Sequence, residues 1–302
     1  MSKASQREIL ITGATGAQGG AVARHLLRRG YRVRALCRDP GRPAARALAA
    51  AGARVIRGDL DDRASLDAAA VGVHGVFGVQ NFWDGFPGPN LGLEGEVRQG
   101  KSLLDAAKAA GVAHFVQATA GGGPGLCGVP STDGKREIEA HARAIGIPIT
   151  IIRPVFFMDN FDKPGWGFQG PILEGRLELA VAADRKLQMV AVDDIGHFAA
   201  MAFDRPGELV GAEFDLAGDE LTMLEIAATF SRVMGRPVRF TGGPEGIPAL
   251  RAFHEELALI FEWFNRGRFD AFIPALRALH PGLLTLEAHL RRAGWEGRGA
   301  GS

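Results

Sequence analysis

The fold is decided by residues 7–30, REILITGATGAQGGAVARHLLRRG. The opening REILIT is mostly apolar and rich in branched side chains, which predicts a strand. In the closing AVARHLLRRG, Val22, Leu26 and Leu27 share one helical face, and Gly30 ends the helix. Between strand and helix stands GATGAQG, a G-x-x-G-x-x-G pattern that begins at residue 13.

Glycines at a turn from strand to helix serve a specific chemistry. They permit a tight turn, let the backbone approach a diphosphate and let the helix pack on the strand, while the helix N-terminus supplies N–H groups. The pattern therefore predicts a dinucleotide site, and a structural turn without a ligand is the alternative. The residues that we expect to contact the dinucleotide here are Gly13, Thr15, Gly16, Ala17, Gln18 and Gly19.

Strand-like and helix-like segments alternate from residue 7 to residue 154. Five further strands are expected at 31–38, 53–59, 75–79, 114–119 and 147–154. Because each strand has a helical segment beside it, the pattern predicts an α/β fold with a doubly wound parallel (Rossmann) sheet. We expect a dinucleotide-binding domain at 1–155 and a smaller, mostly helical substrate-side domain at 156–302, of which 187–218 returns to the core sheet.

The composition excludes several classes of protein. The 302 residues hold 35 Lys and Arg against 34 Asp and Glu, which argues against binding of nucleic acid through a basic face. Two cysteines, Cys37 and Cys127, and eight widely separated histidines predict neither a disulfide framework nor a zinc site. No apolar run reaches the length of a membrane span, about 18 residues. We therefore expect a soluble, cytoplasmic protein that acts without nucleic acid or membrane.

A second phosphate-binding pattern occurs at residues 95–102, GEVRQGKS, which fits the P-loop motif G-x-x-x-x-G-K-[ST]. No strand precedes it, and Glu94 and Glu96 would place carboxylates beside a phosphate. The apolar residues Val97 and Leu104 instead continue one helix through the segment. We interpret this match as fortuitous and rank an ATPase far below the dinucleotide site.

Residues 38–42, RDPGR, follow the second strand and are expected to meet the adenosine ribose. The guanidinium groups of Arg38 and Arg42 suit a 2′-phosphate, so we favour NADP(H) over NAD(H). Asp39 leaves two alternatives open: it can accept a hydrogen bond from a 2′-hydroxyl, or it can cap the next helix. The adenine contacts are expected just past the third strand, at Asp59 and Leu60.

This combination of sheet and turn resembles the short-chain dehydrogenase/reductase superfamily, whose typical members use a Tyr-x-x-x-Lys pair. The chain has a single tyrosine, Tyr31, which begins the second strand at the end of the sheet away from ligands. Lys135 is present, but Ser131 stands where the tyrosine of the pair is expected. The composition therefore excludes tyrosine-dependent ketone reduction.

Lys135 is expected in the first turn of its helix, where the helix dipole disfavours a cation. It shares a face with Ile138, Ala142 and Ile145, so we expect its side chain to point to the sheet and to need an anionic or hydroxyl partner. The ribose hydroxyls of a cofactor would serve, and a desolvated lysine can also act as a general acid or base. The alternative is a surface lysine whose ammonium group reaches water.

Longer stretches resemble the NmrA-like family of atypical short-chain dehydrogenases. They are TGATGAQGGAVARHLL, CRDPGRP, GDLDD, VRQGK, TDGKREIEAHARAIGIPITIIRP and FFMDNF, dense over residues 7–161 and looser beyond. The resemblance implies NADP(H) binding and one of two roles, a redox-sensing regulator or a reductase that transfers hydride. By position it also implies cofactor contacts from Gln80, Asn81, Phe82, Arg98, Lys135, Phe157 and Asn160, besides the glycine turn, Arg38, Arg42 and Asp59.

Aromatic residues gather after the fourth and sixth expected strands, and five of them fall within residues 156–168. With few polar groups beside them, such rings suit a flat apolar molecule, such as a quinone or an aromatic enone. We expect Thr119 among the residues that contact the cofactor, and its hydroxyl group can also donate a hydrogen bond to a substrate oxygen. The alternative is that the rings pack against the core. The expected pocket residues are Trp83, Phe86, Phe156, Phe161 and Trp166.

Two functions follow from these observations. The favoured one is an NADPH-dependent oxidoreductase that transfers hydride to a planar apolar acceptor, with Lys135 as the candidate catalytic residue. The second is a non-catalytic NADP(H)-binding redox sensor that acts on a protein partner. A partner surface is available in the helical segment 251–277, which can equally be core or the face of a homodimer.

Overall fold

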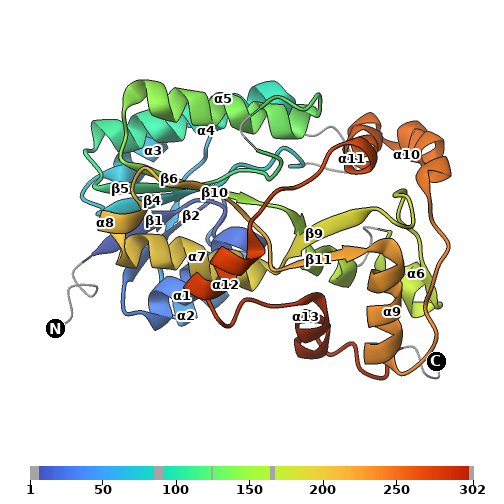
Figure 1. Ribbon diagram of the computed structural model, residues 1–302. Helices are drawn as coiled ribbons and strands as arrows, with labels where there is room; N and C mark the ends of the chain where they lie inside the picture. Colours follow the sequence, from blue (N-terminus) through green and yellow to red (C-terminus); the bar gives the residue numbers. More distant parts are fainter. Residues whose placement is uncertain (1–6, 85–90, 124, 164–166, 299–302) are drawn as a thin grey trace. The chain divides into compact units, whose positions relative to one another are not determined.

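The computed structural model describes residues 7–84, 91–123, 125–163 and 167–298 (Figure 1). The chain divides into two compact units. The first holds residues 1–120, 130–153 and 195–214, and the second holds 121–129, 154–194 and 215–302. Of the expected pocket residues, Phe86 and Trp166 lie outside the described part of the chain.

A seven-stranded sheet, in the order β10-β6-β5-β4-β1-β2-β3, forms the centre of the first unit. β1 pairs in parallel with β2 and β4, and the same direction continues from β2 to β3, from β4 to β5 and from β5 to β6. The doubly wound parallel sheet expected from the sequence is therefore confirmed, with β10 as a seventh strand. The strands are β1 (Glu8–Ile11), β2 (Arg32–Cys37), β3 (Arg54–Arg57), β4 (Gly75–Gly78), β5 (His114–Ala118), β6 (Ile149–Pro154) and β10 (Glu213–Leu216).

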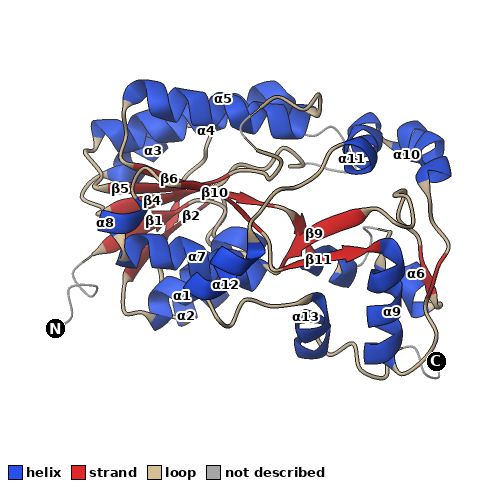
Figure 2. Cartoon of the chain, viewed as in Figure 1, coloured by secondary structure: helices blue, strands red, loops and turns tan. Residues whose placement is uncertain are grey.

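Helices cover both faces of this sheet (Figure 2). They are α1 (Ala17–Arg28), α2 (Pro43–Ala50), α3 (Arg63–Ala70), α4 (Gly92–Ala109), α5 (Pro130–Ile145), α7 (Val192–Asp204) and α8 (Pro206–Leu209). The first three residues of α7, through Asp194, are counted with the second unit. Leu103 and Leu104 of α4 and Ile138 of α5 are fully buried in one apolar cluster with Val76 and Phe115 of the sheet. This burial is what holds α4 and α5 above the strands whose ends form the candidate site.

The P-loop-like segment 95–102 lies inside α4. A Cβ atom at Gly100 would lie 2.5 Å from Cδ1 of Ile138, so the glycine serves the close packing of α4 on α5. The backbone N–H groups of a helix interior are already bonded within the helix and cannot surround a phosphate. The structure thus agrees with the interpretation of the motif as fortuitous.

The second unit contains shorter elements. They are β7 (Phe156–Phe157), η2 (Met158–Asp162), α6 (Gln169–Leu173), β8 (Arg176–Leu177), β9 (Lys186–Val190), β11 (Asp219–Thr222), α9 (Met223–Met234), β12 (Arg239–Phe240), η3 (Pro244–Gly246), α10 (Ile247–Phe253), α11 (Glu255–Arg266), α12 (Ile273–Leu279) and α13 (Leu286–Arg292). The strands form two small sheets, β11-β9-β7 and β12-β8.

Aromatic packing forms the core of the second unit. Phe161, Phe230 and Trp295 are fully buried, and the ring of Phe230 lies 5.2 Å from that of Phe161 and 5.1 Å from that of Trp295. α9 begins with a capping box, in which Thr222 Oγ1 accepts from Glu225 N at 3.2 Å and the Glu225 carboxylate accepts from Thr222 N at 2.8 Å. Such a box fixes the start of the helix that carries Phe230 into this core.

Within the described residues, no helix combines the length and the apolar character needed to cross a membrane. The same residues contain no group of three or more His, Cys, Asp or Glu side chains that could hold a metal ion.

Candidate functional site

The glycine turn joins β1 to α1 at the point where the strand order reverses, since β1 lies between β2 and β4. Gly13 has a φ of +58°, and its carbonyl accepts a hydrogen bond from Gly16 N at 2.9 Å. Gly16 is the N-cap of α1 and supplies no side-chain cap, and the first turn of the helix carries no acidic residue. The first N–H groups of α1 are therefore left for a ligand or water.

The space around the turn admits nothing larger than glycine at two positions. A Cβ atom at Gly19 would lie 2.4 Å from the carbonyl oxygen of Gly13 and 2.7 Å from that of Thr12. A Cβ atom at Gly13 would lie 2.7 Å from Cγ1 of Val79, which follows β4. Thr12 Oγ1 accepts a hydrogen bond from Val79 N at 3.0 Å, which ties the turn to the end of β4.

These features fit a dinucleotide diphosphate. Thr15, Gly16 and Ala17 are exposed, so backbone of the turn faces solvent. An exposed backbone turn at a helix N-terminus, located at the switch point of a parallel sheet, is the usual arrangement for binding this group.

Two arginines stand at the rim after β2. The Arg38 guanidinium donates to both carboxylate oxygens of Asp84, at 2.7 and 3.2 Å, and 63% of its side chain remains exposed. Arg42 is 71% exposed, with Nε 3.9 Å from the carboxylate of Asp39. Asp39 itself accepts from Gly41 N at 2.9 Å, so it forms a turn ahead of α2. It does not cap that helix, because the N-cap residue of α2 is Arg42 and no side chain caps it. The two guanidinium groups therefore keep most of their donors for a ligand.

The residues after β3 form a turn of their own. Asp59 N donates to Ser65 Oγ at 3.0 Å, and the Asp59 carboxylate accepts from Asp61 N at 3.1 Å. Arg98 of α4 donates to the Asp61 carboxylate at 2.8 Å. Burial alone raises the pKa of Asp61, but the hydrogen bonds from Arg98 and Gln99 hold it below its usual value. Arg98, expected at the cofactor, thus lies in an exposed ion pair with Asp61. Leu60, which precedes Asp61 in the sequence, is half-buried.

The segment after β4 makes contacts from buried positions. The Gln80 side-chain oxygen accepts from Gln117 Nε2 of β5 at 2.9 Å. Phe82 N donates to Oε1 of Glu96, a residue of α4, at 3.2 Å. Asn81 between them is exposed, and its side-chain oxygen accepts from Trp83 N at 3.2 Å. The backbone of this segment is therefore fixed at the carboxyl edge, with Asn81 turned toward solvent.

Lys135 does not lie in the first turn of its helix, as the sequence suggested, because α5 begins at Pro130. The helix dipole consequently disfavours its charge less than expected. Its ammonium group donates to Oε1 of Glu96 and, at 3.1 Å, to the carbonyl of Ser131. The side chain is 16% exposed. The anionic partner that the sequence required is thus present within the protein, on α4.

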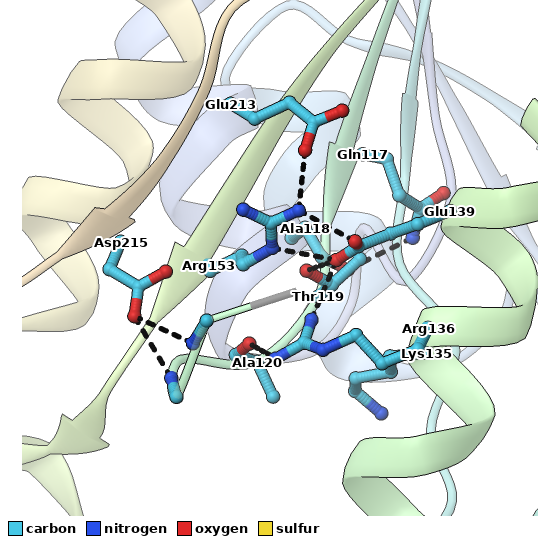
Figure 3. A network of polar contacts seen from close by, with 12 residues as sticks. Gln117, Ala118, Thr119, Ala120, Lys135, Arg136, Glu139, Arg153, Glu213 and Asp215 are labelled. Atoms are coloured by element: carbon cyan, nitrogen blue, oxygen red, sulfur yellow. Dashed lines mark hydrogen bonds and ion pairs between the residues drawn. The ribbon is translucent and has the colours of Figure 1, made fainter. Parts of the chain in front are cut away.

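A buried polar network fixes α5 on the sheet one turn after Lys135 (Figure 3). The Glu139 carboxylate, fully buried, accepts from Thr119 Oγ1 at 2.8 Å, Arg136 Nη1 at 2.7 Å and Arg153 Nε at 2.9 Å. Burial would raise the pKa of Glu139, but the two arginines and Thr119 hold it below its usual value. Thr119, proposed as a donor to substrate, therefore directs its hydroxyl proton to Glu139.

The network extends to β10. Arg153 also donates to the Glu213 carboxylate at 2.6 Å, as does Arg143 at 2.7 Å, and these arginines lower the pKa of Glu213 to about 2. In Figure 3, Arg136 turns into the network, whereas the nitrogen of the neighbouring Lys135 points away from it. Sequence reasoning missed both Glu139 and Glu96; the available signal was a carboxylate on the apolar face of each helix.

The remaining predicted site residues belong to the second unit. Phe156 and Phe161 are 9% and 0% exposed, and their rings lie 5.5 Å apart in the core of that unit. Their burial supports the packing alternative for these two rings. Phe157 is half-buried, and the side-chain oxygen of Asn160 lies 3.4 Å from Nζ of Lys163.

The chain resembles known proteins in sequence. The sequence model of the NmrA-like family matches residues 5–290. A curated relative, the (4-alkanoyl-5-oxo-2,5-dihydrofuran-3-yl)methyl phosphate reductase of Streptomyces griseus subsp. griseus, is 34% identical over 242 residues. That alignment covers 77% of this chain and 76% of the relative.

Solved structures share the fold. The triphenylmethane reductase of Citrobacter sp., complexed with NADP(H), superimposes with a TM-score of 0.79 at 23% identity and covers 95% of this chain and 99% of its own. NmrA, a negative transcriptional regulator, gives a TM-score of 0.79 at 21% identity and covers 96% of each chain. At these identities the two likenesses support the fold and not a shared activity.

Proposed function

Because the chain belongs to the NmrA-like family, we propose that it is an NADPH-dependent oxidoreductase that transfers hydride to a planar apolar acceptor, such as a quinone or an aromatic enone. The observation that carries the proposal is the glycine turn, where backbone groups are exposed at the switch point of a parallel sheet and Gly13 and Gly19 leave no room for a Cβ atom. The cofactor supplies the hydride when it is bound.

Residues of the first unit would hold this cofactor. The glycine turn would bind the diphosphate through backbone N–H groups, and Arg38 and Arg42 would bind the 2′-phosphate of NADPH. Their high exposure supports this assignment, because donors that already face solvent need no rearrangement to meet a phosphate. Asp59 and Leu60 would lie at the adenine, and Lys135 at the ribose on the nicotinamide side.

The names of the relatives support an acceptor with a conjugated ring. The Streptomyces reductase is named for an acylated oxo-dihydrofuran, and the Citrobacter enzyme for triphenylmethane compounds. In this chain, Trp83 is a half-buried aromatic side chain that follows β4, with its ring 5.2 Å from that of Phe82. An indole at that edge suits stacking on a flat acceptor.

The residues of the chain restrict how a proton reaches the product. The single tyrosine, Tyr31, donates to Asp204 at 2.9 Å at the amino end of β2, and burial and this hydrogen bond raise its pKa to about 12. It therefore cannot serve the carboxyl edge of the same sheet. We therefore propose Lys135 or water as the source of the proton that an enolate or hydroquinone anion takes up after hydride transfer.

A regulatory role is the second candidate. The observation that favours it is the pair of Lys135 with the buried carboxylate of Glu96, which leaves the lysine already partnered without a substrate. The fold likeness to the regulator NmrA is compatible with this role. We also propose that the protein works in the cytoplasm, and that it acts without nucleic acid, as its near-zero net charge suggests.

Purified protein mixed with NADPH and a panel of quinones and aromatic enones tests the proposal. We expect NADPH oxidation with at least one acceptor, and a loss of about 100-fold in kcat for Lys135→Met. Lys101→Met, which removes an exposed lysine of α4 paired with Glu137 at 3.6 Å, is the matched control and should keep full activity. Tight cofactor binding without turnover of any acceptor would support the sensor instead.

A further inference from the structure

We infer that Glu96 is a positioning residue that sets the relative affinity of the protein for NADP⁺ and NADPH through its ion pair with Lys135. The inference rests on the proposed cofactor site. It deepens that proposal, because discrimination between oxidised and reduced cofactor matters to a reductase and to a sensor alike.

The contacts of Glu96 join three segments of the first unit. Its side chain is fully buried on α4. Oε1 accepts from the ammonium group of Lys135 on α5 and, at 3.2 Å, from the backbone of Phe82 in the segment after β4. A single carboxylate oxygen thus fixes the lysine beside the carboxyl end of β4.

The negative charge of Glu96 is compensated mainly by Lys135, because the second carboxylate oxygen, Oε2, has no partner of its own among the residues that the structure describes. Within the described residues, Oε2 of Glu96 is buried and makes no hydrogen bond. It lies 3.5 Å from the position that a Cβ atom at Gly134 would occupy, so α5 approaches it closely. A buried carboxylate is costly unless a cation compensates it, and Lys135 is the cation that contacts Glu96 here.

The place of the pair in the sheet determines which part of the cofactor it would face. In a doubly wound sheet, the diphosphate lies at the switch point and the two halves of the sheet bind the two nucleotides. The arginines after β2 assign the adenosine half to the β2 side of β1. The Glu96–Lys135 pair, beside the end of β4, therefore belongs to the nicotinamide half.

Charge then gives the pair a measurable effect. The nicotinamide ring is cationic in NADP⁺ and neutral in NADPH. An ammonium group alone at this edge would repel the oxidised ring, and Glu96 offsets that repulsion because the ion pair carries no net charge. Removing either partner should therefore shift the preference between the two cofactor forms, in opposite directions.

Calorimetric titration of the full-length protein with NADP⁺ and with NADPH tests this without any turnover. For Glu96→Gln, which keeps an acceptor for Phe82 N, we expect the ratio Kd(NADP⁺)/Kd(NADPH) to rise about tenfold. For Lys135→Met it should fall by a similar factor. The double variant, with no charge on either side chain, should return close to the wild-type ratio.

Two further variants separate the charge of Glu96 from its role in packing. Glu96→Asp keeps the charge and should keep the ratio within about twofold. Glu137→Gln, which removes the charge of an exposed carboxylate on α5, is the matched control and should leave the ratio unchanged. An unchanged ratio in Glu96→Gln, or in Glu96→Ala should the first variant fail to fold, overturns the inference. Failure of the wild-type protein to bind either cofactor would instead overturn the proposed function.

Discussion

The two units of this chain differ in how their buried carboxylates are compensated. In the first unit, Glu139 has no exposed surface but meets three arginines (Arg136, Arg143 and Arg153) and Thr119. Arg136, Arg153 and Thr119 hold its pKa below the usual value. In the second unit, Asp194 is 2% exposed and meets Leu284 N at 3.1 Å and His280 Nε2 at 3.3 Å. Burial dominates there and raises its pKa to about 6.

This difference shows where polar function can be supported. The first unit combines compensated carboxylates with exposed guanidinium and N–H groups, which suits the binding of a charged cofactor. The second unit is built on an aromatic core, in which Phe161 contacts the rings of both Phe156 and Phe230. Rings that are used in packing are not available to a ligand, so aromatic composition alone is a weak indicator of a pocket.

The largest effect is expected from breaking the compensation in the first unit. Glu139→Ala leaves Arg136 and Arg153 without their shared carboxylate and should lower the free energy of unfolding by about 3–5 kcal/mol. Urea unfolding followed by circular dichroism measures it. Glu208→Ala is the control, because its pair with Arg205 is long (3.9 Å) and exposed and should contribute less than about 1 kcal/mol. Equal losses of unfolding free energy in both variants would show that the buried network stabilises the fold no more than an exposed ion pair does.

The carboxyl of Asp194 should make the second unit less stable as pH rises. Its folded pKa of about 6 exceeds the unfolded value of about 3.9, so the native state binds the proton more tightly. Stability from this group is complete below about pH 4 and is lost as pH rises through 6, by about 2–3 kcal/mol. Glu213, with a pKa lowered to about 2, has the opposite dependence, since its contribution disappears as pH falls below about 4.5.

Asp194→Asn isolates the first of these effects. The amide is neutral at every pH, so the variant should match the wild type near pH 4 and exceed it in stability at pH 7.5. Unfolding followed by tryptophan fluorescence measures the difference, because Trp263 and Trp295 lie in the second unit. A wild type that stays as stable as the variant across this range would contradict a raised pKa of Asp194.

The glycine turn offers the next contrast. Gly19→Ala forces a Cβ atom to within 2.4 Å of the Gly13 carbonyl, so the backbone must shift where the diphosphate would bind. A misplacement of about 1 Å can cost about 100-fold in function, and we expect a loss of that order in cofactor affinity, measured by calorimetry. Gly207→Ala in α8 is the control, because no atom lies within 4 Å of its added Cβ. If both variants bind equally, the turn is only structural.

How much of this could be predicted from sequence differs between the units. The strands of the first unit alternate with helices, and Gly13, Arg38 and Asp59 follow β1, β2 and β3, so the sheet and the glycine turn could be predicted from the local pattern. In the second unit, β7, β8 and β12 hold two residues each, too few to show any periodicity. Their pairing depends on tertiary contacts that a local pattern does not contain.

The Glu96–Lys135 pair was missed for a related reason. Its two residues are 39 positions apart, and only the packing of α4 on α5 brings them together. In the sequence, Glu96 served only as an argument against a P-loop at residues 95–102. It shares a helical face with Gly100 and the fully buried Leu103, so a charged residue on an apolar face was the signal that could have identified it.

The smallest effect is expected where charge is exposed, at the rim of the first unit. Arg38→Ala should reduce the preference for NADPH over NADH by about tenfold and leave stability unchanged, because the Arg38–Asp84 pair is largely solvated. The ratio of Kd values for the two cofactors measures it. Arg63→Ala removes another exposed arginine, paired with Asp67 on α3, and should not alter the ratio. If the preference for NADPH over NADH is unchanged in Arg38→Ala, Arg38 does not bind the 2′-phosphate. The first unit would then not divide into buried charges that stabilise the fold, such as Glu139, and exposed charges that bind the ligand, such as Arg38.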